Sequence, residues 1–395
     1  MRRRGAHDVV IVGAGMVGAA LALALARADF DVALVESRAP APWRREDEVD
    51  LRVVALAASS IALFERLDVW KTIRAARARA YRHMRVWDAL APGQLHFDAA
   101  DEGANALGYI VENRLIQHVL WQALQADARI TLHCPAKVAA TEVDTERRTL
   151  QLADDSRVAA RLVVAADGAE SVLRDLLGIA THERDYAQRA IVAHVRTERA
   201  HADTAWQRFL PHGTIAFLPL LDGRSSIVWS VPNAEAERLL ALEDARFRDE
   251  LGAASDFRLG RVVASTPRAA FPLRMKHAEA YVAPRFALIG DAAHVVHPLA
   301  GQGVNLGLRD VDELCAALSE ARDAKRDFAS ATVLRRYERR RRSDNAIAAH
   351  SFDAIQRVFG SESTPVAVLR GAGLGLVDKL TPLKQLFARH AAGRT

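Results

Sequence analysis

The sequence predicts an α/β fold: a Rossmann-like domain built on a parallel sheet, interrupted by a mainly antiparallel β-sheet domain and followed by C-terminal helices. Three short apolar runs each end in a glycine-rich or acidic turn, as do strands buried on both faces of a parallel sheet. Between them lie β-prone runs separated by turn residues, which is typical of antiparallel strands. A chain of 395 residues is long enough for two such domains.

The predicted domains are discontinuous, because the β-prone segments are inserted twice into the Rossmann-like part. The turn Asp222-Gly223 between two β-prone runs predicts a hairpin in the second insertion. We expect the Rossmann-like domain at residues 1–80, 105–180 and 276–330, the β-sheet domain at residues 81–104 and 181–275, and the helical region at residues 331–395.

The first unit has the order of a dinucleotide-binding motif. An apolar run leads into Gly13, Gly15 and Gly18, an Ala- and Leu-rich stretch follows, and a second apolar run ends at Glu36. In such a motif the first glycine makes the tight turn, the second admits a pyrophosphate, and the third lets helix and strand pack closely. Glu36 stands where a carboxylate accepts hydrogen bonds from a ribose diol. The alternative is a tight turn without a ligand.

The second and third units place acidic residues beside glycines at the ends of apolar runs. Asp167-Gly168 follows one run, and Gly290-Asp291 follows the other and precedes a long glycine-rich loop. A helix is expected after that loop, from about residue 303. Either aspartate could instead cap the segment that follows it.

Composition narrows the class of protein. The net charge of +5 permits an anionic cofactor or surface but does not call for nucleic acid, and the arginine-rich run at residues 335–342 is typical of a solvated helix face. The two cysteines, Cys134 and Cys315, indicate neither a disulfide framework nor a zinc site. No signal peptide or membrane span is evident, so we expect a cytoplasmic protein without a bound metal.

The three units together resemble the flavin-dependent aromatic hydroxylases of the p-hydroxybenzoate hydroxylase type. The segment at residues 297–310 reads HPLAGQGVNLGLRD and is similar to the signature of the ubiquinone-biosynthesis hydroxylases within that group. The runs FLPL at residues 217–220 and FPL at residues 271–273 also look like this family. The resemblance spans most of the chain, since the three units extend from residue 9 to residue 310.

The resemblance implies FAD as cofactor, NAD(P)H as electron donor, and O2 as co-substrate reacting through a flavin hydroperoxide. It implies no catalytic side chain, because the flavin performs the chemistry beside a loop with Pro298, Gly301 and Gly303. A helix starting near Gly303 would point its N–H groups at the reduced flavin and stabilise negative charge on the ring. The cofactor-binding residues so implied are Gly13, Gly15, Met16, Val17, Gly18, Glu36, Arg52, Arg114, Gln117, Asp167, Gly168, Gly290, Asp291, Pro298, Gly301, Gly303, Val304 and Asn305.

Several of these roles have alternatives. Ser171 and Arg174 resemble the family's middle motif, which is linked to FAD and NADPH phosphates. Arg52 resembles an arginine packed near the flavin, and the alternative is a surface ion pair with Asp50. His294 and His297 resemble residues that shape the loop rather than act as bases.

By the same resemblance, the protein would hydroxylate a polyprenylated phenol in ubiquinone biosynthesis, with Phe217, Leu218 and Pro219 near the substrate ring. It would work within a quinone-biosynthesis protein assembly. Three alternatives stay open: a hydroxylase of a soluble aromatic or specialised metabolite, a flavoprotein reductase acting on prenyl chains, and a non-catalytic FAD-binding member of that assembly.

The last segment of the chain carries an apolar stripe at helical spacing. Leu376, Leu380, Leu383 and Phe387 recur at such intervals, with basic residues elsewhere around the helix. The stripe predicts a helix docked on the core or on a partner chain. The alternative is peripheral contact of this helix with a membrane surface, which would suit a substrate with a lipid tail.

Overall fold

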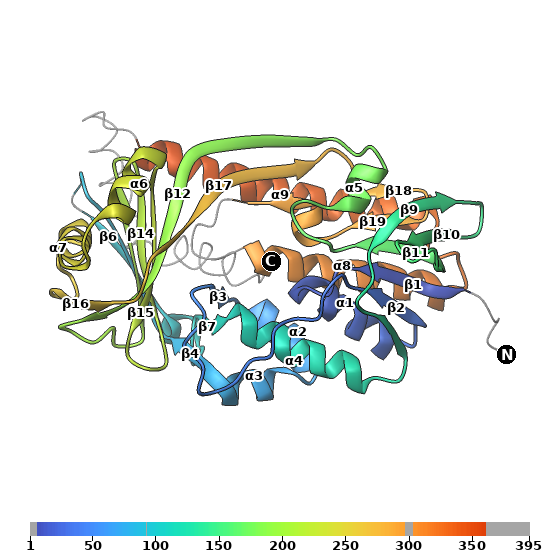
Figure 1. The fold of residues 1–395 in the computed structure, drawn as a ribbon, viewed down its shortest axis with the longest axis horizontal. Helices are drawn as coiled ribbons and strands as arrows, with labels where there is room; N and C mark the ends of the chain where they lie inside the picture. The colour runs from blue at the N-terminus through green and yellow to red at the C-terminus, as the bar shows by residue number, and fades with distance from the viewer. Residues whose placement is uncertain (1–5, 92, 297–302, 361–395) are drawn as a thin grey trace.

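The computed structural model describes residues 6–91, 93–296 and 303–360. Figure 1 shows two large sheets at opposite ends of the long axis, with the long strands β12 and β17 running between them along one side. A smaller three-stranded sheet lies between the two. This arrangement is the predicted α/β fold, with a parallel sheet and a separate, mainly antiparallel one.

The first sheet has eight strands and a parallel centre. Strand β1 pairs in parallel with β2 and β11, and β11 pairs in parallel with β19. These four strands are almost completely buried because both faces of the sheet are covered. The order is β18 (Val282–Ala283), β19 (Phe286–Leu288), β11 (Arg157–Ala165), β1 (His7–Val12), β2 (Val32–Val35) and β8 (Ile130–His133), with β10 (Arg148–Leu152) and β9 (Val138–Val143) extending from β11.

The second sheet is mainly antiparallel, as expected from the β-prone segments. Its one parallel pair among the described strands joins β13 to β5, where the two insertions meet. The predicted hairpin at Asp222-Gly223 connects β14 and β15. The order is β20 (His294–Val295), β17 (Ala269–Ala278), β12 (Thr181–Thr197), β15 (Ser225–Pro232), β14 (Gly213–Pro219), β13 (Thr204–Leu210), β5 (His83–Asp88) and β6 (Gln94–Asp98), with β16 (Val262–Ser265) beside β12.

The two faces of this second sheet pack against different partners. The outer face carries Phe217 and Trp229 and packs against helices α6 (Asn233–Ala241) and α7 (Asp244–Ala254). The inner face carries Leu218 and packs against the three-stranded sheet. That small sheet consists of β3 (Val53–Leu56), β7 (Gly108–Glu112) and β4 (Ala78–Tyr81).

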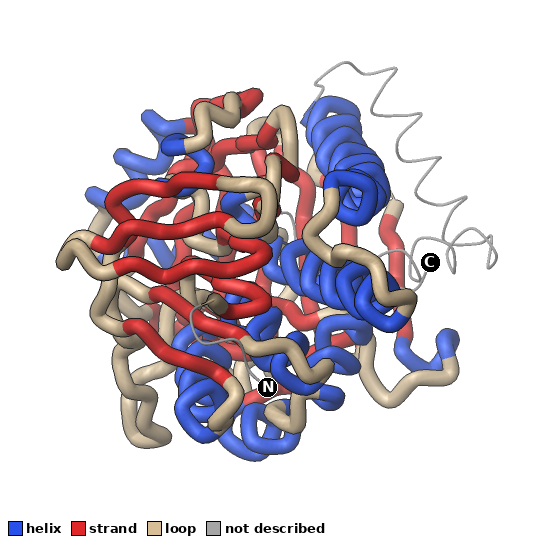
Figure 2. Tube along the Cα trace, turned by 90° about the vertical axis from the view of Figure 1, so that its right-hand side faces the viewer, coloured by secondary structure: helices blue, strands red, loops and turns tan. Residues whose placement is uncertain are grey.

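The remaining helices flank the sheets. In the view of Figure 2 they lie against the strands rather than in a separate bundle. They are α1 (Met16–Arg27), α2 (Ala58–Arg66), α3 (Trp70–Arg77), α4 (Asn113–Ala126), α5 (Val172–Leu176), α8 (Gly303–Asp323) and α9 (Ala331–Gly360), together with short 3-10 turns at Ala99–Glu102 and Gly290–Ala292.

The helical stretch predicted after residue 330 begins with α9. Its first turns contribute Val333, Leu334 and Tyr337 to the same buried core as the parallel sheet. The predicted stripe from Leu376 to Phe387 lies outside the described residues. No helix in the described part of the chain is long and apolar enough to cross a bilayer. The expected domain boundaries stay a prediction.

Candidate functional site

The glycine loop between β1 and α1 is shaped by close backbone contacts. A Cβ atom on Gly13, whose φ is +102°, would lie 2.3 Å from the carbonyl oxygen of Ala166. A Cβ atom on Gly18 would lie 2.0 Å from the carbonyl oxygen of Gly13. These two positions therefore admit only glycine. Gly15 differs, because a Cβ atom there would meet no described atom within 4 Å. The first turn of α1 thus opens onto space that a pyrophosphate can occupy.

Two further predicted residues, Met16 and Val17, lie in that first turn. The side chain of Val17 packs against Gly290, and a Cβ atom on Gly307 of α8 would lie 2.7 Å from a methyl carbon of Val17. The first and third motifs therefore meet at Val17. Gly307 lets α8 approach α1 closely, because a side chain there would collide with Val17.

Glu36 lies at the end of β2, beside the glycine loop. Its carboxylate accepts a hydrogen bond of 2.6 Å from the backbone N–H of Ala14. The other oxygen accepts from the hydroxyl of Ser37 and the backbone N–H of Arg38, each at 3.0 Å. The chain thus holds the carboxylate at the mouth of the glycine loop, where the ribose was predicted.

The turn at Gly290-Asp291 brings Arg52 to the third motif. The Asp291 side chain is exposed, yet enough protein surrounds it that desolvation raises its pKa, while His294 and Arg52 act in the opposite direction. The guanidinium carbon of Arg52 also lies 5.7 Å from the centre of the Phe271 ring. The contact with Asp50 comes from the Arg52 backbone N–H, at 3.2 Å.

Asp167 leaves one carboxylate oxygen without a protein partner. Its Oδ2 accepts from the backbone N–H of Leu173 at 3.2 Å, whereas Oδ1 is buried and has no hydrogen-bond partner among the described residues. Burial raises the pKa of this carboxyl group, although nearby hydrogen bonds oppose the change. A buried, unpaired oxygen in a native protein calls for a partner, and a ligand can supply one.

The other polar residues of the middle motif turn inward. Ser171 caps α5 by accepting the backbone N–H of Arg174. Arg174 is buried, and its Nη1 donates at 3.1 Å to the carbonyl of Ala292. This hydrogen bond ties the second motif to the turn that carries Asp291. Gly168, with φ +87°, leaves open space where a side chain would stand.

Helix α8 begins at Gly303, as predicted, and a Cβ atom there would meet no described atom within 4 Å. Val304 follows in the first turn. The side chain of Asn305 is held within the protein: it accepts from the Ala57 N–H and the Ser60 hydroxyl and donates to the Ala55 carbonyl. The predicted Pro298 and Gly301, with His297, lie outside the described residues.

Arg114 holds the connection between β2 and β3. We name residues 42–50 of this connection the strap. The Arg114 guanidinium donates to the carbonyl of Pro42 at 2.6 Å and to the carboxylate of Asp47 at 2.8 Å. Gln117 lies half-buried one turn further along α4. Binding of the cofactor by these two side chains stays a prediction.

Buried charged side chains hold the strap in place near Asp47 and Asp50. The Glu112 carboxylate is 2 % exposed and accepts the backbone N–H of Asp50 at 2.7 Å. Arg77 lies 3.2 Å from Glu112 and also donates to the carbonyl of Asp47. Burial raises the pKa of Glu112, while the Asp50 N–H and Arg77 oppose the change.

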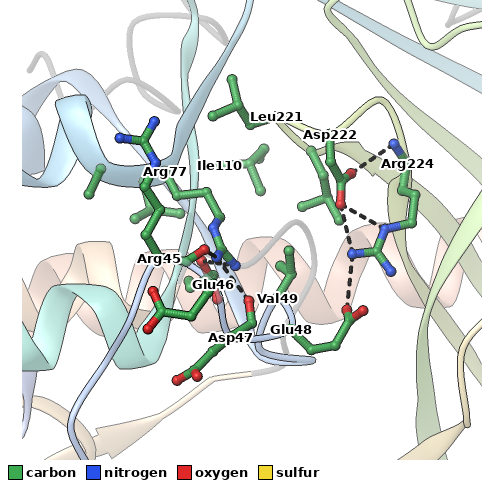
Figure 3. Close-up of a pocket in the computed structure, with 14 residues that line it drawn as sticks. Arg45, Glu46, Asp47, Glu48, Val49, Arg77, Ile110, Leu221, Asp222 and Arg224 are labelled. Atoms are coloured by element: carbon green, nitrogen blue, oxygen red, sulfur yellow. Dashed lines mark hydrogen bonds and ion pairs between the residues drawn. The ribbon is translucent and has the colours of Figure 1, made fainter.

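A cavity of about 400 Å³ lies between the strap and the hairpin of β14 and β15 (Figure 3). Arg224 spans it, bonded to Asp222 on its own hairpin and to Glu48 of the strap at 3.2 Å. Ile110 and Leu220 line the cavity and also belong to the buried cluster on the inner face of the second sheet. The cavity therefore adjoins that inner face.

The three residues predicted beside the substrate ring do not share one face. Strand alternation directs Phe217 outward, where it packs with Trp229 and Phe247 in the cluster under α6 and α7. Leu218 points inward and packs with Ala55 and Ile110. Pro219 ends the strand and is buried. Of the two neighbours on the strand, Leu218 is the one that faces the cofactor motifs.

A buried charge network that we did not predict supports the third motif. Asp310 of α8 is 0 % exposed and accepts hydrogen bonds from Nε2 of His294 at 2.6 Å, Nε of Arg341 at 2.7 Å and the backbone N–H of Gly290 at 2.9 Å. Burial alone would raise the pKa of Asp310, but His294 and Arg341 lower it to about 2. The aspartate was visible within the family-like segment. Its partner Arg341 belongs to the arginine-rich run that we expected on a solvated helix face, and for this residue the expectation is wrong, because Arg341 is buried against Asp310.

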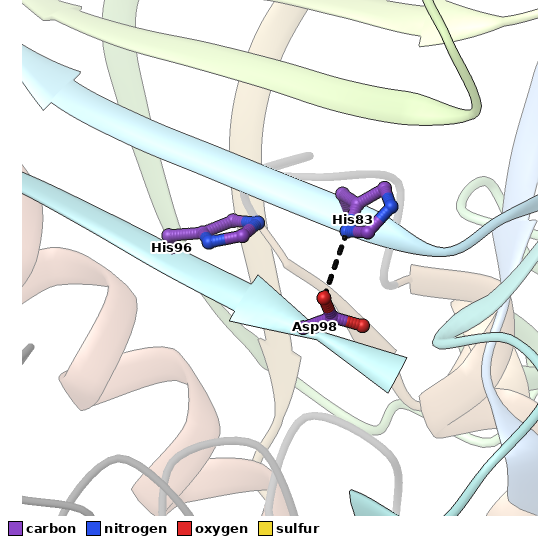
Figure 4. Close-up of side chains that lie close together, drawn as sticks. All are labelled: His83, His96 and Asp98. Atoms are coloured by element: carbon purple, nitrogen blue, oxygen red, sulfur yellow. Dashed lines mark ion pairs between the residues drawn. The ribbon is translucent and has the colours of Figure 1, made fainter. Parts of the chain in front are cut away.

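A histidine and aspartate cluster lies elsewhere, on strands β5 and β6 (Figure 4). The potential ligand atoms of His83, His96 and Asp98 lie within 4.8 Å of one another. Nδ1 of His83 is 3.3 Å from the Asp98 carboxylate, so an ion pair accounts for that contact. This cluster is separate from the residues of the three motifs.

The features of the three motifs fit FAD. Gly15 leaves a gap at the start of α1, an orphaned oxygen of Asp167 lies next to the glycine loop, and the exposed carboxylate of Asp291 is acted on by the charge of Arg52. The N-terminus of α8 supplies a further set of backbone donors. These groups belong to the three motifs from which the sequence predicts a cofactor site.

Comparison with known proteins agrees with this geometry. Residues 6–350 match the family described as FAD binding domain. The chain is 40% identical over 388 residues to 3-demethoxyubiquinol 3-hydroxylase of Escherichia coli (strain K12), covering 98% of each chain. It is 34% identical to the mitochondrial ubiquinone biosynthesis monooxygenase COQ6 of Homo sapiens, covering 98% of this chain and 92% of that protein.

Solved structures share the fold. p-Nitrophenol 4-monooxygenase PnpA from Pseudomonas putida DLL-E4 superposes with a TM-score of 0.77 at 18% identity, over 98% of both chains. A single-residue variant of Klebsiella pneumoniae HpxO, complexed with FAD, gives a TM-score of 0.73 at 20% identity, covering 98% of this chain and 99% of that one. The chain belongs to the FAD-binding family of flavoprotein hydroxylases that includes the ubiquinone-biosynthesis monooxygenases.

Proposed function

We propose that the protein is an FAD-dependent monooxygenase that hydroxylates the aromatic ring of a polyprenylated phenol during ubiquinone biosynthesis. The observation that carries the proposal is full-length similarity, at 40% identity, to a 3-demethoxyubiquinol hydroxylase. The electron donor is NAD(P)H and the oxidant is O2. Bound FAD would supply the redox chemistry between them.

The chain's own residues bind and orient the cofactor. The first turn of α1 receives the pyrophosphate at Gly15, Glu36 holds the adenosine ribose, and Asp291 binds the ribityl chain. Arg52 balances the charge of Asp291, because it lies close enough to oppose the rise in the pKa of that carboxyl group. The positive end of the α8 dipole stabilises negative charge that develops on the ring system in front of it.

The substrate ring is proposed to bind on the inner face of the second sheet. Leu218 packs there against Ala55, and the carbonyl of Ala55 accepts from Asn305 in the first turn of α8 at 2.8 Å. The apolar inner face and the start of α8 are therefore neighbours. A prenylated ring held against Leu218 would lie beside the flavin, shielded from water by the apolar side chains around it.

Substrate preference tests this function. Oxygen uptake and product mass are measured with NADPH and either a 2-polyprenylphenol in detergent micelles or the same phenol without its chain. We expect the prenylated phenol to give a product one oxygen atom heavier than the substrate, and the unprenylated phenol to be turned over much more slowly. Faster hydroxylation of the unprenylated phenol would identify a hydroxylase of soluble aromatics instead.

The lipid-soluble tail of this substrate has consequences for where the protein acts and which proteins it binds. We propose peripheral contact with a membrane surface, and association with other proteins of quinone biosynthesis, because the substrate resides in lipid. Flotation of the purified protein with anionic lipid vesicles tests the first point. Absence of the protein from the vesicle fraction, at low and at physiological salt, would contradict membrane contact.

A further inference from the structure

Two buried polar side chains stand side by side on the inner face of the second sheet. His194 on β12 pairs in register with Ser226 on β15, and Ser226 pairs with Leu218 on β14. The flanking residues Ala193 and Val195 belong to the outer-face cluster, so strand alternation directs His194 to the inner face. The same row therefore carries the proposed ring contact, Leu218, and two polar groups.

These polar groups have no partners within the described chain. His194 is 1 % exposed and Ser226 is 0 % exposed. Both ring nitrogens of His194 and the hydroxyl oxygen of Ser226 are buried without a hydrogen bond to any residue that the structure describes. An unpaired buried polar atom is costly to the folded state, so three such atoms on two adjacent side chains call for an explanation.

Another buried histidine shows that burial alone does not produce this state. His201, 5 % exposed, lies at 3.2 Å from the Leu220 carbonyl through Nε2 and accepts the Asp203 backbone N–H at Nδ1. The fold thus satisfies His201 completely with backbone groups. At His194 the neighbouring strand offers only Ser226, and the two side chains do not bond to each other.

Ser226 stands two residues after Arg224, which lines the cavity of Figure 3. Four charged groups act on the pKa of His194, namely Arg224, Asp222, Glu48 and Asp50. The first three of these line the cavity between the strap and the hairpin. A ring that enters from this cavity past Leu220 would reach the row of Leu218, Ser226 and His194.

The imidazole of His194 is suited to a neutral hydroxyl partner. Burial, with Arg224 acting in the same direction, lowers its pKa to about 4. The ring is therefore neutral at physiological pH and offers one N–H donor and one nitrogen acceptor. Ser226 adds a hydroxyl that can donate or accept. A phenolic O–H, which is both donor and acceptor, matches this pair, whereas a carboxylate would leave the imidazole acceptor without a proton to bind.

We propose that His194 and Ser226 are the substrate-binding residues that recognise the hydroxyl group of the phenolic ring, and so fix which ring edge faces the flavin. This inference rests on the proposed function, because it takes the substrate to be a prenylated phenol. Leu218 contacts the ring in the same row. The phenolic hydroxyl then supplies the hydrogen-bond partners that the protein lacks.

A comparison of a phenol with its methyl ether tests this role. Binding of 2-prenylphenol and of its O-methyl ether to the FAD-loaded protein is measured by the change in flavin absorbance. The wild type should prefer the phenol by about tenfold, the effect of one or two net hydrogen bonds. In Ser226→Ala and His194→Leu this preference should fall towards one. The matched control is Ser225→Ala, the adjacent buried serine, which pairs with Val195 of the outer face and should keep the preference.

Thermal unfolding shows whether these side chains recognise the substrate or only stabilise the fold. Removing an unpaired buried hydroxyl should leave the melting temperature of Ser226→Ala unchanged or raise it. A variant that keeps the wild-type preference, or a wild type that does not distinguish phenol from ether, would overturn the inference. Product formation by the wild type is followed in parallel. A wild type that prefers the phenol but never hydroxylates it would instead overturn the proposed function alone.

Discussion

Asp310 carries a buried negative charge that joins the turn at Gly290 to helix α9, and Asp310→Asn removes that charge with little change of shape. In the wild type the carboxylate accepts from His294, Arg341 and the Gly290 N–H. The amide keeps one oxygen acceptor. It removes the buried counter-charge of the Arg341 guanidinium, which is 3 % exposed, and leaves the more exposed carboxylate of Asp344 at 3.0 Å.

The expected loss of unfolding free energy is large. Removing one partner of a buried ion pair typically costs about 3–5 kcal/mol. The direction of the pKa shift agrees with this: His294 and Arg341 lower the pKa of Asp310, so folding favours its charged form. The variant should therefore lose about 3 kcal/mol or more. It should also bind FAD more weakly, because the turn that carries Asp291 loses its anchor.

Urea unfolding of the wild type and the variant at pH 7 measures this loss, with FAD absorbance recorded for each. The control is Glu142→Gln, which breaks an exposed ion pair with Arg157 and should cost less than about 1 kcal/mol. Because the pKa of Asp310 is lowered by folding, its contribution is present above about pH 4 and is lost as the pH falls towards about 2. A loss below about 1 kcal/mol at pH 7, or one that grows as the pH falls, would refute the reasoning.

Three further predictions concern the cofactor and substrate sites. Gly15→Ala should keep the fold, because the φ of −61° at this position suits alanine and the surroundings are open, but it should weaken FAD binding in a titration. Gly18→Ala should instead lower the melting temperature of the apoprotein, because its Cβ atom would collide with the backbone. Asp291→Ala should release most FAD while the apoprotein stays folded, and purified variant with a full complement of flavin would contradict its role. Phe217→Ala should lower the free energy of unfolding by about 3–5 kcal/mol with little change in KM, whereas Leu218→Ala should raise KM. If steady-state kinetics showed the reverse, Phe217 rather than Leu218 would be the residue that contacts the substrate.

The parts of the site that could be predicted are those in which local sequence dictates local geometry. Gly13 and Gly18 were identifiable because a tight turn and a close helix–strand contact leave no room for a side chain. The start of α8 at Gly303 followed from a glycine-rich loop preceding a helical pattern. The proximity of the three motifs followed from parallel pairing of the strands that precede them.

The remainder depends on contacts between distant segments. Alternation shows that Phe217 and Leu218 face opposite sides, but only the packing of α6 and α7 decides which side is outward. Arg341 lies 31 residues from Asp310, and no spacing rule connects them. In the sequence, His194 is noticeable only as a polar residue within an apolar run. Its lack of partners becomes visible only when the neighbouring strand is placed beside it.

We propose that this chain binds FAD along its three motifs and transfers oxygen from O2 to a prenylated phenol. The most direct measurement reduces the purified, FAD-loaded protein with NADPH in the absence of oxygen and then adds 18O2 together with 2-prenylphenol. We expect a hydroxylated product with one 18O atom per molecule. Re-oxidation of the flavin with hydrogen peroxide as the sole product, or a hydroxylated product without the label, would contradict it.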